Sequence, residues 1–329
     1  MPYLVYYDSG TSNSRIYLLD GAFQVLYTEK KNVGSKDSSI AGSNRVLIEG
    51  LYELYRNMLS ATGIGEGDIE RIYASGMVTC PYGLKEVPHL VIPTSAEHLA
   101  ASIVCFREEQ LFHRDIWLIP GLKTTGDDIS MVNNLRGEEM EILGTLDTLR
   151  ARYPDRKKIA LLLPGSHTHT ILLEGEQVTD IFSCMTGELF YALSTSTILA
   201  AVLNEKTEGL DADMVRLGAR NLRTFGFNRA IYICHAMRLF QKGTPLERKS
   251  YAEGVVNGGL VEGLTWKCQH GWEGCETAVL VSNRYMYELY GALLADHPFL
   301  KEVGWLPISK EKSYAVEGLK KILSCGKGV

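Results

Sequence analysis

Short apolar runs alternate with turn-forming residues along the first thirty positions. Runs at 3–7, 15–19 and 23–31 contain aromatic, Leu, Ile and Val residues, and DSGTSNS and Asp20-Gly21 interrupt them. Such runs, bounded by Gly, Asp, Asn and Ser, are typical of strands joined by tight turns. The sequence therefore predicts three successive strands, arranged as a β-meander.

A helical pattern follows, starting at Ser43 and ending at Gly63. Its apolar stripe consists of Val46, Leu47, Leu51, Leu54, Tyr55, Met58 and Leu59. Spacings of three and four residues indicate an amphipathic helix, and a glycine is a common residue just beyond a helix end. Beyond it we expect a strand at 72–77, a helix at 96–104, a strand at 116–119 and a helix at 136–150. The predicted order is βββαβα, with an additional strand and helix.

The same order begins again after Pro154. Strands are expected at 159–165, 169–173 and 177–184, followed by helical segments at 188–203 and 211–261, a strand at 277–281 and helices at 285–295 and 310–323. This repetition predicts an α/β protein with a duplicated βββαβα unit. We expect two domains, 1–154 and 155–329, with a cleft between them.

Composition agrees with two domains and excludes several classes of protein. A chain of 329 residues is longer than the size at which proteins usually keep a single hydrophobic core. Its content of 45% hydrophobic and 22% charged residues is ordinary for a folded protein. A net charge of -5 argues against a nucleic-acid partner. No apolar run reaches the ~20 residues that span a bilayer, and MPYLVYYDSG does not resemble a secretion signal, so we expect no membrane partner and a cytoplasmic location.

Seven cysteines at irregular spacing indicate reduced thiols rather than a disulfide framework. Cys268, His270 and Cys275 have the spacing C-x-H-x4-C, which suggests a zinc site. Structural zinc usually takes four protein ligands, and this segment offers no fourth.

Each half places a polar turn between its first two strands. The first turn begins at Asp8, where a carboxylate at the end of a buried strand needs a cation or hydrogen-bond donors. Gly10 allows close approach of a phosphate, Thr11 and Ser12 offer hydroxyls and N–H groups, and Arg15 adds positive charge. A plain hairpin with Asp8 as a turn cap is the alternative.

The second turn is PGSHTH at 164–169, again between two apolar strands. Taken singly it is also explained by a hairpin with exposed hydroxyls. Two such turns at matching positions of a duplicated unit favour a paired anion site for the phosphates of a nucleotide.

Two helix starts carry further acidic residues. Arg136, Glu138 and Glu139 lie in NNLRGEE, and Glu188 lies in MTGEL. Capping and the helix dipole explain an acidic residue at either start without any function.

Taken together and in this order, DSGTSNSR, SGMVT (75–79), PGL (120–122), LRGEEMEILG, LPGSH and MTGELFYAL resemble the 2-dehydro-3-deoxygalactonokinase family. SYAVEGLKKIL at 313–323 is similar to the last helix of that family. The resemblance implies a ribonuclease H-like, actin-like ATPase fold of the sugar kinase superfamily. It also implies phosphorylation of 2-dehydro-3-deoxy-D-galactonate at its terminal hydroxyl by ATP with Mg²⁺, in galactonate degradation.

The resemblance also assigns roles to residues. The expected nucleotide contacts are Gly10, Thr11, Ser12, Arg15, Gly165, Ser166 and His167, with Ser282 and Asn283 beside the adenine. The expected sugar-acid contacts are Asn13, Ser75, Met77, Thr79, Thr186 and Glu188. Asp8 is expected to face magnesium, and Asp8, Arg136, Glu138 and Glu139 form the expected catalytic group, with Glu138 as the favoured base. Besides this small-molecule substrate, a homodimer is compatible with the sequence.

Four segments depart from the family pattern. Ser9 stands in place of Trp, His169-Thr170 in place of Lys-Trp, and Ser282-Asn283 in place of a Gly-rich turn. The loop 79–84 also differs from the Gly-Ser and Gly-Trp pattern of the family. A phosphate beside His169 would raise the pKa of its imidazole and favour turnover at lower pH. The departures leave two alternatives: a binding protein that has lost turnover, or a nucleotide or polyphosphate hydrolase, against which the MTGEL segment argues.

Overall fold

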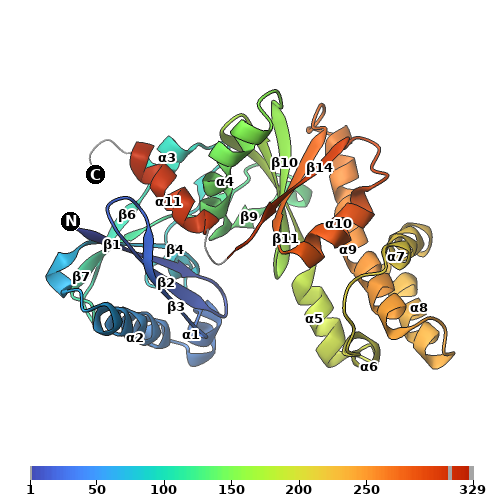
Figure 1. Cartoon of the computed structure of the whole chain (residues 1–329), viewed down its shortest axis with the longest axis horizontal. Coiled ribbons are helices and arrows are strands. Elements are labelled where there is room, and N and C mark those ends of the chain that lie inside the picture. The colour runs from blue at the N-terminus through green and yellow to red at the C-terminus, as the bar shows by residue number, and fades with distance from the viewer. Residues whose placement is uncertain (1, 310–312, 326–329) are drawn as a thin grey trace. The chain divides into compact units, whose positions relative to one another are not determined.

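The computed structural model describes residues 2–309 and 313–325. They form two compact units (Figure 1). The first comprises the chain up to Pro154 together with helix α11 (Tyr314–Cys325), and the second spans Asp155–Ser309. In the described part of the chain, no helix combines the length and the apolar character needed to cross a membrane.

The first unit is built on a six-stranded sheet with the order β3-β2-β1-β4-β7-β6. The first three strands are antiparallel neighbours, which confirms the predicted meander, and β4 and β7 continue the sheet parallel to β1. Its strands are β1 (Tyr3–Ser9), β2 (Ser14–Leu19), β3 (Val25–Lys31), β4 (Ile69–Gly76), β6 (Val104–Glu108) and β7 (Arg114–Leu118).

Helices cover this sheet on both sides, with α2 on one side and α11 on the other (Figure 1). The helices of the unit are α1 (Ser35–Ala41), α2 (Arg45–Thr62), α3 (Ala96–Ala101), α4 (Glu138–Arg152) and α11, with short 3-10 turns η1 (Glu66–Asp68), η2 (Met77–Thr79) and η3 (Ile129–Met131). A small second sheet orders β5 (Leu90–Val91), β8 (Leu122–Lys123) and β9 (Asn134–Leu135). The helix predicted at 96–104 is wrong at its end, because β6 already starts at Val104.

Helix α11 packs closely on α4, as Figure 1 shows. Two glycines allow this contact: a Cβ on Gly144 would lie 1.9 Å from the Tyr314 carbonyl oxygen, and one on Gly318 would lie 1.9 Å from that of Met140. Assigning 155–329 to the second domain is therefore wrong for this last helix. Its amphipathic pattern reveals an apolar face but not the surface that the face covers.

The second unit repeats the first. Its sheet has the order β12-β11-β10-β13-β14, with the same sequence of antiparallel and parallel neighbours as β3-β2-β1-β4-β7. The strands are β10 (Lys158–Pro164), β11 (His167–Glu174), β12 (Gln177–Met185), β13 (Thr277–Ser282) and β14 (Glu302–Pro307). The duplicated α/β fold is therefore confirmed.

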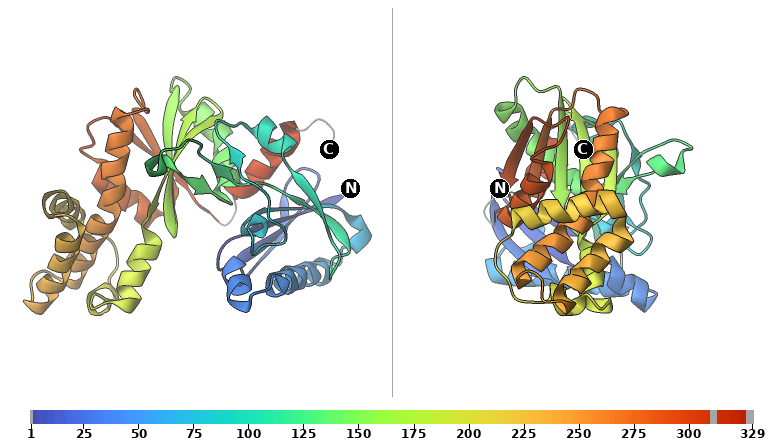
Figure 2. Two further views of the ribbon diagram at one scale, coloured as in Figure 1. Left: turned by 180° about the vertical axis from the view of Figure 1, so that it is seen from behind. Right: turned by 90° about the vertical axis from the view of Figure 1, so that its right-hand side faces the viewer.

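The helices of this unit are more broken than the pattern indicated. They are α5 (Gly187–Ser196), α6 (Ala200–Leu203), α7 (Ala212–Phe225), α8 (Phe227–Leu239), α9 (Pro245–Gln269) and α10 (Arg284–Leu294). The predicted helical section 211–261 is divided at Gly226, whose φ is 73°, and again before Pro245, where Thr244 and Glu247 form a capping box. Figure 2 shows α7, α8 and α9 gathered in one layer, in yellow to orange.

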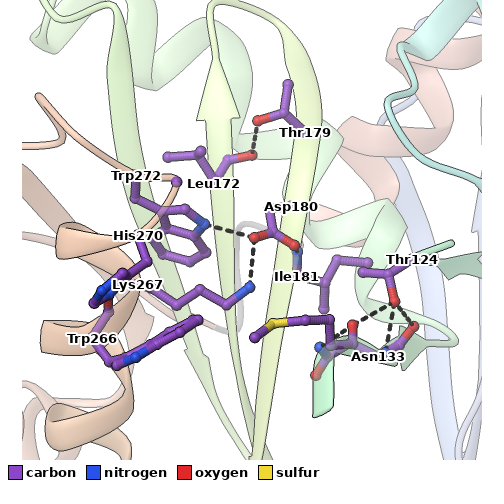
Figure 3. A network of polar contacts seen from close by, with 12 residues as sticks. Thr124, Asn133, Leu172, Thr179, Asp180, Ile181, Trp266, Lys267, His270 and Trp272 are labelled. Atoms are coloured by element: carbon purple, nitrogen blue, oxygen red, sulfur yellow. Dashed lines mark hydrogen bonds and ion pairs between the residues drawn. The ribbon is translucent and has the colours of Figure 1, made fainter. Parts of the chain in front are cut away.

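A buried ion pair joins α9 to the sheet of this unit (Figure 3). Lys267 Nζ lies 2.7 Å from Asp180 Oδ2, and Trp272 Nε1 donates to the same oxygen at 2.7 Å. Cys268 and Cys275 lie beside this pair in the apolar core, whereas the His270 ring stacks on Trp266. These positions do not fit the suggested zinc site, and the structure as described holds no group of three or more His, Cys, Asp or Glu suited to a metal ion.

Candidate active site

The turn after β1 is seated on the start of α1. Gly10 N–H closes the turn by donating to Asn13 O at 2.7 Å, and the Thr11 carbonyl accepts from Lys36 N–H at 3.0 Å. A Cβ on Gly34 would lie 2.3 Å from the Thr11 carbonyl oxygen, so only glycine fits there. Helix α1 thus fixes the back of the turn and leaves its front to solvent.

The turn after β10 has the same support. Glu188 N–H, in the first turn of α5, donates to Ser166 O at 2.8 Å, and a Cβ on Gly187 would lie 2.3 Å from the Gly165 carbonyl oxygen. In each unit, therefore, one glycine approaches a carbonyl oxygen of the turn, and this contact is part of the duplication. This close approach explains the glycine of MTGEL without reference to any ligand.

Exposure decides which turn residues are free to meet a ligand. Thr11, Ser12, Gly165, Ser166 and His167 are exposed, as a phosphate-binding turn requires. The neighbouring Ser9 and Ser14 are buried instead, with their hydroxyl oxygens 2.8 Å apart.

Asp8 is the penultimate residue of β1 and lies between two polar neighbours. Its register partners are Arg15 on β2 and Ser75 on β4, and its own side chain is partly exposed. Burial raises the pKa of Asp8 to about 6, while Arg15 lowers it and Glu138 raises it further. The positive charge of Arg15 therefore offsets only part of the cost of a charged Asp8 carboxylate.

The start of α4 supplies two of the other expected acids. Glu138 Oε2 accepts from the Arg136 N–H at 3.2 Å, and Glu139 Oε2 accepts from the Gly137 N–H at 2.6 Å. Glu139 is fully buried, and its Oε1 has no hydrogen-bond partner in the described part of the chain. Burial, followed by the charge of Glu138, raises the pKa of Glu139 to about 8.

Glu141 is a further acid that our reading of the sequence missed. Burial raises its pKa to about 8, with Asp8 and Glu138 adding to the effect and Arg15 opposing it. Residues three apart on a helix share a face, so Glu138 and Glu141 lie on the same side of α4, and the charges of Asp8 and Glu138 both raise the pKa of Glu141. The signal was available in EEME, but acidic residues in a first helical turn are so common that the helix dipole explained them.

Arg136 is engaged with protein groups. Its Nη1 donates to Thr79 O at 2.7 Å and to the Thr79 hydroxyl, and its Nη2 lies 3.2 Å from His89 Nδ1. Burial and the charge of Arg136 lower the pKa of His89 to about 4. Arg136 therefore organises the loop that follows β4.

Several expected sugar-acid residues have internal partners. The Ser75 hydroxyl lies 2.7 Å from the Tyr6 hydroxyl, and Thr79 Oγ1 donates to Gly76 O at 2.9 Å. Ser75 and Thr79 are fully buried, which does not fit direct contact with a substrate, whereas Met77 and Asn13 are partly exposed.

The two histidines of the second turn differ in environment. His167 is exposed, and its Nε2 lies 3.1 Å from Glu188 Oε2. His169 is buried with Nδ1 2.8 Å from the Ser183 hydroxyl, and burial followed by the charge of His167 lowers its pKa to about 4. In the protein on its own, desolvation thus favours the neutral ring, and the raised pKa expected beside a phosphate stays a prediction.

A chain of buried hydrogen bonds leads away from the second turn. The Thr186 hydroxyl lies 2.7 Å from that of Thr168, which lies 3.1 Å from the Tyr290 hydroxyl. Tyr290 in turn donates to Asn257 Oδ1 at 3.0 Å. Thr186, expected at the sugar acid, is therefore part of an internal network that reaches α9 and α10.

The network continues to the beginning of α10. Asn257 Nδ2 and the Tyr285 hydroxyl each donate to Glu253, both at 3.0 Å. Just before Tyr285, Asn283 caps α10 by accepting from the Met286 N–H at 2.9 Å, and the buried Ser282 hydroxyl donates to Asn283 O at 3.0 Å. The second turn and the expected adenine segment are thus connected through α9.

Two copies of one strand–turn–strand unit, each with a glycine-supported turn, define an α/β protein of the duplicated ribonuclease H-like, actin-like type. A family model described as 2-keto-3-deoxy-galactonokinase matches residues 8–307. The chain belongs to this family, as its motifs indicated.

Known proteins agree with this assignment. The chain is 28% identical over 141 residues to the 2-dehydro-3-deoxygalactonokinase of Escherichia coli (strain K12), covering 43% of each protein. It is 25% identical over 198 residues to the protein assigned as the 2-dehydro-3-deoxygalactonokinase DgoK1 of Rhizobium meliloti (strain 1021), covering 60% of this chain and 58% of that one. The matches thus span about half the length of these relatives.

A solved structure has the same fold over nearly the whole chain. It is a protein from Sinorhizobium meliloti assigned as a 2-dehydro-3-deoxygalactonokinase, with a TM-score of 0.74 and 20% identity, and the match covers 98% of this chain and 97% of that one.

Proposed function

We propose that this chain is an ATP-dependent kinase that phosphorylates the terminal hydroxyl of 2-dehydro-3-deoxy-D-galactonate or a related keto-deoxy sugar acid. Family membership supports the reaction class, and the repeated glycine-supported turns carry the proposal physically. Phosphoryl transfer depends mainly on positioning and charge neutralisation, which rigid turns with exposed N–H and hydroxyl groups provide. A cytoplasmic location and a homodimer remain predictions.

In the first unit, Thr11 and Ser12 would bind phosphate oxygens through N–H and hydroxyl groups, and Arg15 would add charge. Gly10, whose N–H closes the turn on Asn13 O, would allow the phosphate to approach closely. Asp8 would hold Mg²⁺, which supplies neutralisation of the β- and γ-phosphate oxygens. The raised pKa of Asp8 fits this role, since a desolvated carboxylate beside Glu138 gains from a cation. A single carboxylate suffices because magnesium keeps most of its waters.

Glu138 would accept the proton of the sugar-acid hydroxyl. Its Oε2 is held by the Arg136 N–H, so the carboxylate has a fixed direction at the helix start. Glu139 and Arg136 would act by positioning Glu138 and the loop after β4, because Glu139 is fully buried and Arg136 is bound to Thr79.

In the second unit, Gly165, Ser166 and His167 would bind phosphate in the same way, and Ser282 with Asn283 would lie beside the adenine. Exposed or partly exposed Asn13, Met77 and Glu188 are the sugar-acid contacts that we retain. Thr186, Ser75 and Thr79 would support those contacts from behind, through their internal hydrogen bonds.

The test is ADP release by the purified chain with ATP and Mg²⁺, in the presence and absence of 2-dehydro-3-deoxy-D-galactonate. The kinase predicts release only when a sugar acid is present, with one phosphorylated product per ADP. Release without the acid would establish a hydrolase instead. No release with any of a panel of 2-keto-3-deoxy and aldonic acids would establish a protein without turnover.

A further inference from the structure

A recess opens in the second unit between α7, α9 and the end of α10. It has a volume of about 280 Å³, and its lining comprises Arg216, Ala219, Arg220, Arg223, Val261, Thr265, Ala292, Leu293, Asp296, His297 and Pro298. Three of these side chains are guanidinium groups and one is a carboxylate. The recess therefore combines an apolar floor with a predominantly cationic rim.

The three arginines follow one face of α7, at spacings of four and three residues. Like charges at these spacings repel one another on a helix surface, and carboxylates beside the two outer arginines offset part of this repulsion. Arg216 Nη2 lies 2.5 Å from Asp213 Oδ1, and Arg223 Nη1 lies 3.0 Å from Glu262 Oε1. Each pair uses one nitrogen and leaves other N–H donors of the guanidinium for a ligand.

Arg220, between them, is different. Its side chain is exposed, and in residues 2–309 and 313–325 its guanidinium has neither an ion pair nor a hydrogen bond. Guanidinium groups bind phosphate and carboxylate oxygens through paired N–H donors. The central arginine of the rim is thus available to an anion.

The floor of the recess is fixed by packing. His297 Nδ1 accepts from the Leu300 N–H at 3.1 Å, so Nε2 carries the proton of the neutral ring and donates to Thr265 Oγ1 at 3.0 Å. Thr265 then donates to Val261 O at 2.8 Å. This chain of bonds holds the end of α10 against α9, and small side chains at Ala219 and Ala292 leave the space open.

We propose that this recess binds a small phosphorylated or carboxylated metabolite, with the anionic group on Arg220 and a short carbon chain on the apolar floor. Its volume lies at the lower limit of ligand pockets, which suits a molecule of a few carbons rather than a nucleotide. The recess is distinct from the proposed nucleotide site, because Asn283 begins α10 and the recess contacts its last turn, ~13 Å further along the helix. The inference does not depend on the kinase activity.

Calorimetric titration of the full chain with 3-phosphoglycerate tests this. The titration is made at low salt and in the presence of a saturating non-hydrolysable ATP analogue, which occupies any phosphate-binding turns. We expect a 1:1 complex, and a loss of affinity of about tenfold in Arg220→Gln, on the scale of one charge-assisted hydrogen bond. Arg229→Gln, which changes an exposed arginine of α8 outside the recess, should bind like the wild type.

Three outcomes would overturn the proposal. They are the absence of binding to the wild type, equal affinity in wild type and Arg220→Gln, and displacement of 3-phosphoglycerate by the ATP analogue, which would assign binding to the phosphate turns. Because Arg220 is exposed, its variant should keep the unfolding temperature of the wild type, so lost affinity would not reflect lost structure.

Discussion

Gly187 approaches the carbonyl oxygen of Gly165 so closely that a Cβ at position 187 would lie 2.3 Å from it. The contact couples the start of α5 to the second turn, and Gly34 has the same relation to the first turn. In both units, therefore, the position of a turn depends on the absence of one side chain.

Gly187→Ala should displace the second turn. No Cβ is tolerated at 2.3 Å, so the turn or the helix must move by several tenths of an ångström. If the turn binds phosphate, kcat/KM should fall about tenfold or more, since small displacements in a catalytic site are costly. Gly259→Ala on α9 is the matched control: its Cβ would enter open space, so activity should persist and the unfolding temperature should rise slightly. Equal activity in the wild type, Gly187→Ala and Gly259→Ala would show that the position of the second turn does not affect catalysis.

The sequence predicted the strand–turn–strand units because short apolar runs and turn residues are local signals. The duplication followed from repeating those signals, and the sheet order bears it out. It could not place α11, since an apolar face is compatible with any apolar partner, and the glycine contacts with α4 have no local signature.

The candidate site was predicted less completely. The exposed turn residues were identified from composition, but burial separates them from Ser75, Thr79 and Thr186, whose hydroxyls are used internally. Glu141 was missed because the effect of Asp8 and of burial on its pKa depends on how α4 packs on the sheet. Burial likewise lowers the pKa of His169 in the protein on its own, which the motif did not indicate. Long-range packing thus decides side-chain roles that a motif only suggests.

Asp8→Asn should abolish most turnover and leave the fold intact. The carboxylate would hold magnesium against the nucleotide. Loss of one strong electrostatic contact in a catalytic site lowers kcat by about a hundredfold or more. Because the pKa of Asp8 is raised to about 6, its charge disfavours the folded state at neutral pH, so the variant should unfold at the same or a higher temperature.

Sugar-acid affinity, measured calorimetrically without nucleotide, should change little in this variant. Asp20→Asn is its control, because Asp20 caps the next turn by accepting from Ala22 and Gln24 N–H groups. Equal turnover in wild type, Asp8→Asn and Asp20→Asn would reduce Asp8 to a turn cap.

Glu139→Gln should change the pH dependence of stability. The pKa of Glu139 rises from 4.5 to about 8 on folding, so the folded state binds the proton more tightly than the unfolded state. The resulting stability is complete below pH 4.5 and is lost as the pH rises through 8. The free energy of unfolding is measured in urea at pH 5.5 and 8.5, without nucleotide or magnesium. Its fall between these pH values should be smaller in Glu139→Gln than in the wild type, by about 1–3 kcal/mol. In the control Glu49→Gln, on the exposed face of α2, the free energy of unfolding should fall as much as in the wild type. A fall of the same size in Glu139→Gln would contradict the raised pKa of Glu139.

Tyr290→Phe should weaken nucleotide binding more than sugar-acid binding. Its hydroxyl connects Thr168, behind the second turn, with Asn257 on α9. Its loss removes the donor to the buried Asn257 Oδ1, whereas Thr168 keeps its contact with the Thr186 hydroxyl. We expect a loss of about 1–3 kcal/mol in stability. The KM for ATP should rise severalfold while the KM for the sugar acid stays unchanged. Tyr287→Phe, on the same helix with its ring stacked on Trp305, is the control. Equal increases in both KM values would indicate general loosening rather than positioning of the turn.

Lys267→Met should strongly destabilise the second unit. Lys267 is buried, and its Nζ lies 2.7 Å from Asp180 Oδ2 (Figure 3). Without it, the Asp180 carboxylate keeps the Trp272 and Ile181 N–H groups as donors. Removing one member of a fully buried ion pair costs about 3–5 kcal/mol, and the 27% exposure of Asp180 reduces this cost. Adding Asp180→Asn removes the charge of Asp180, so the double variant should recover part of the loss in urea unfolding. Lys301→Met, which removes an exposed partner of Glu276, should cost less than about 1 kcal/mol. If Lys267→Met costs no more than Lys301→Met, the Asp180 carboxylate is solvated in solution, and the pair contributes little to the fold.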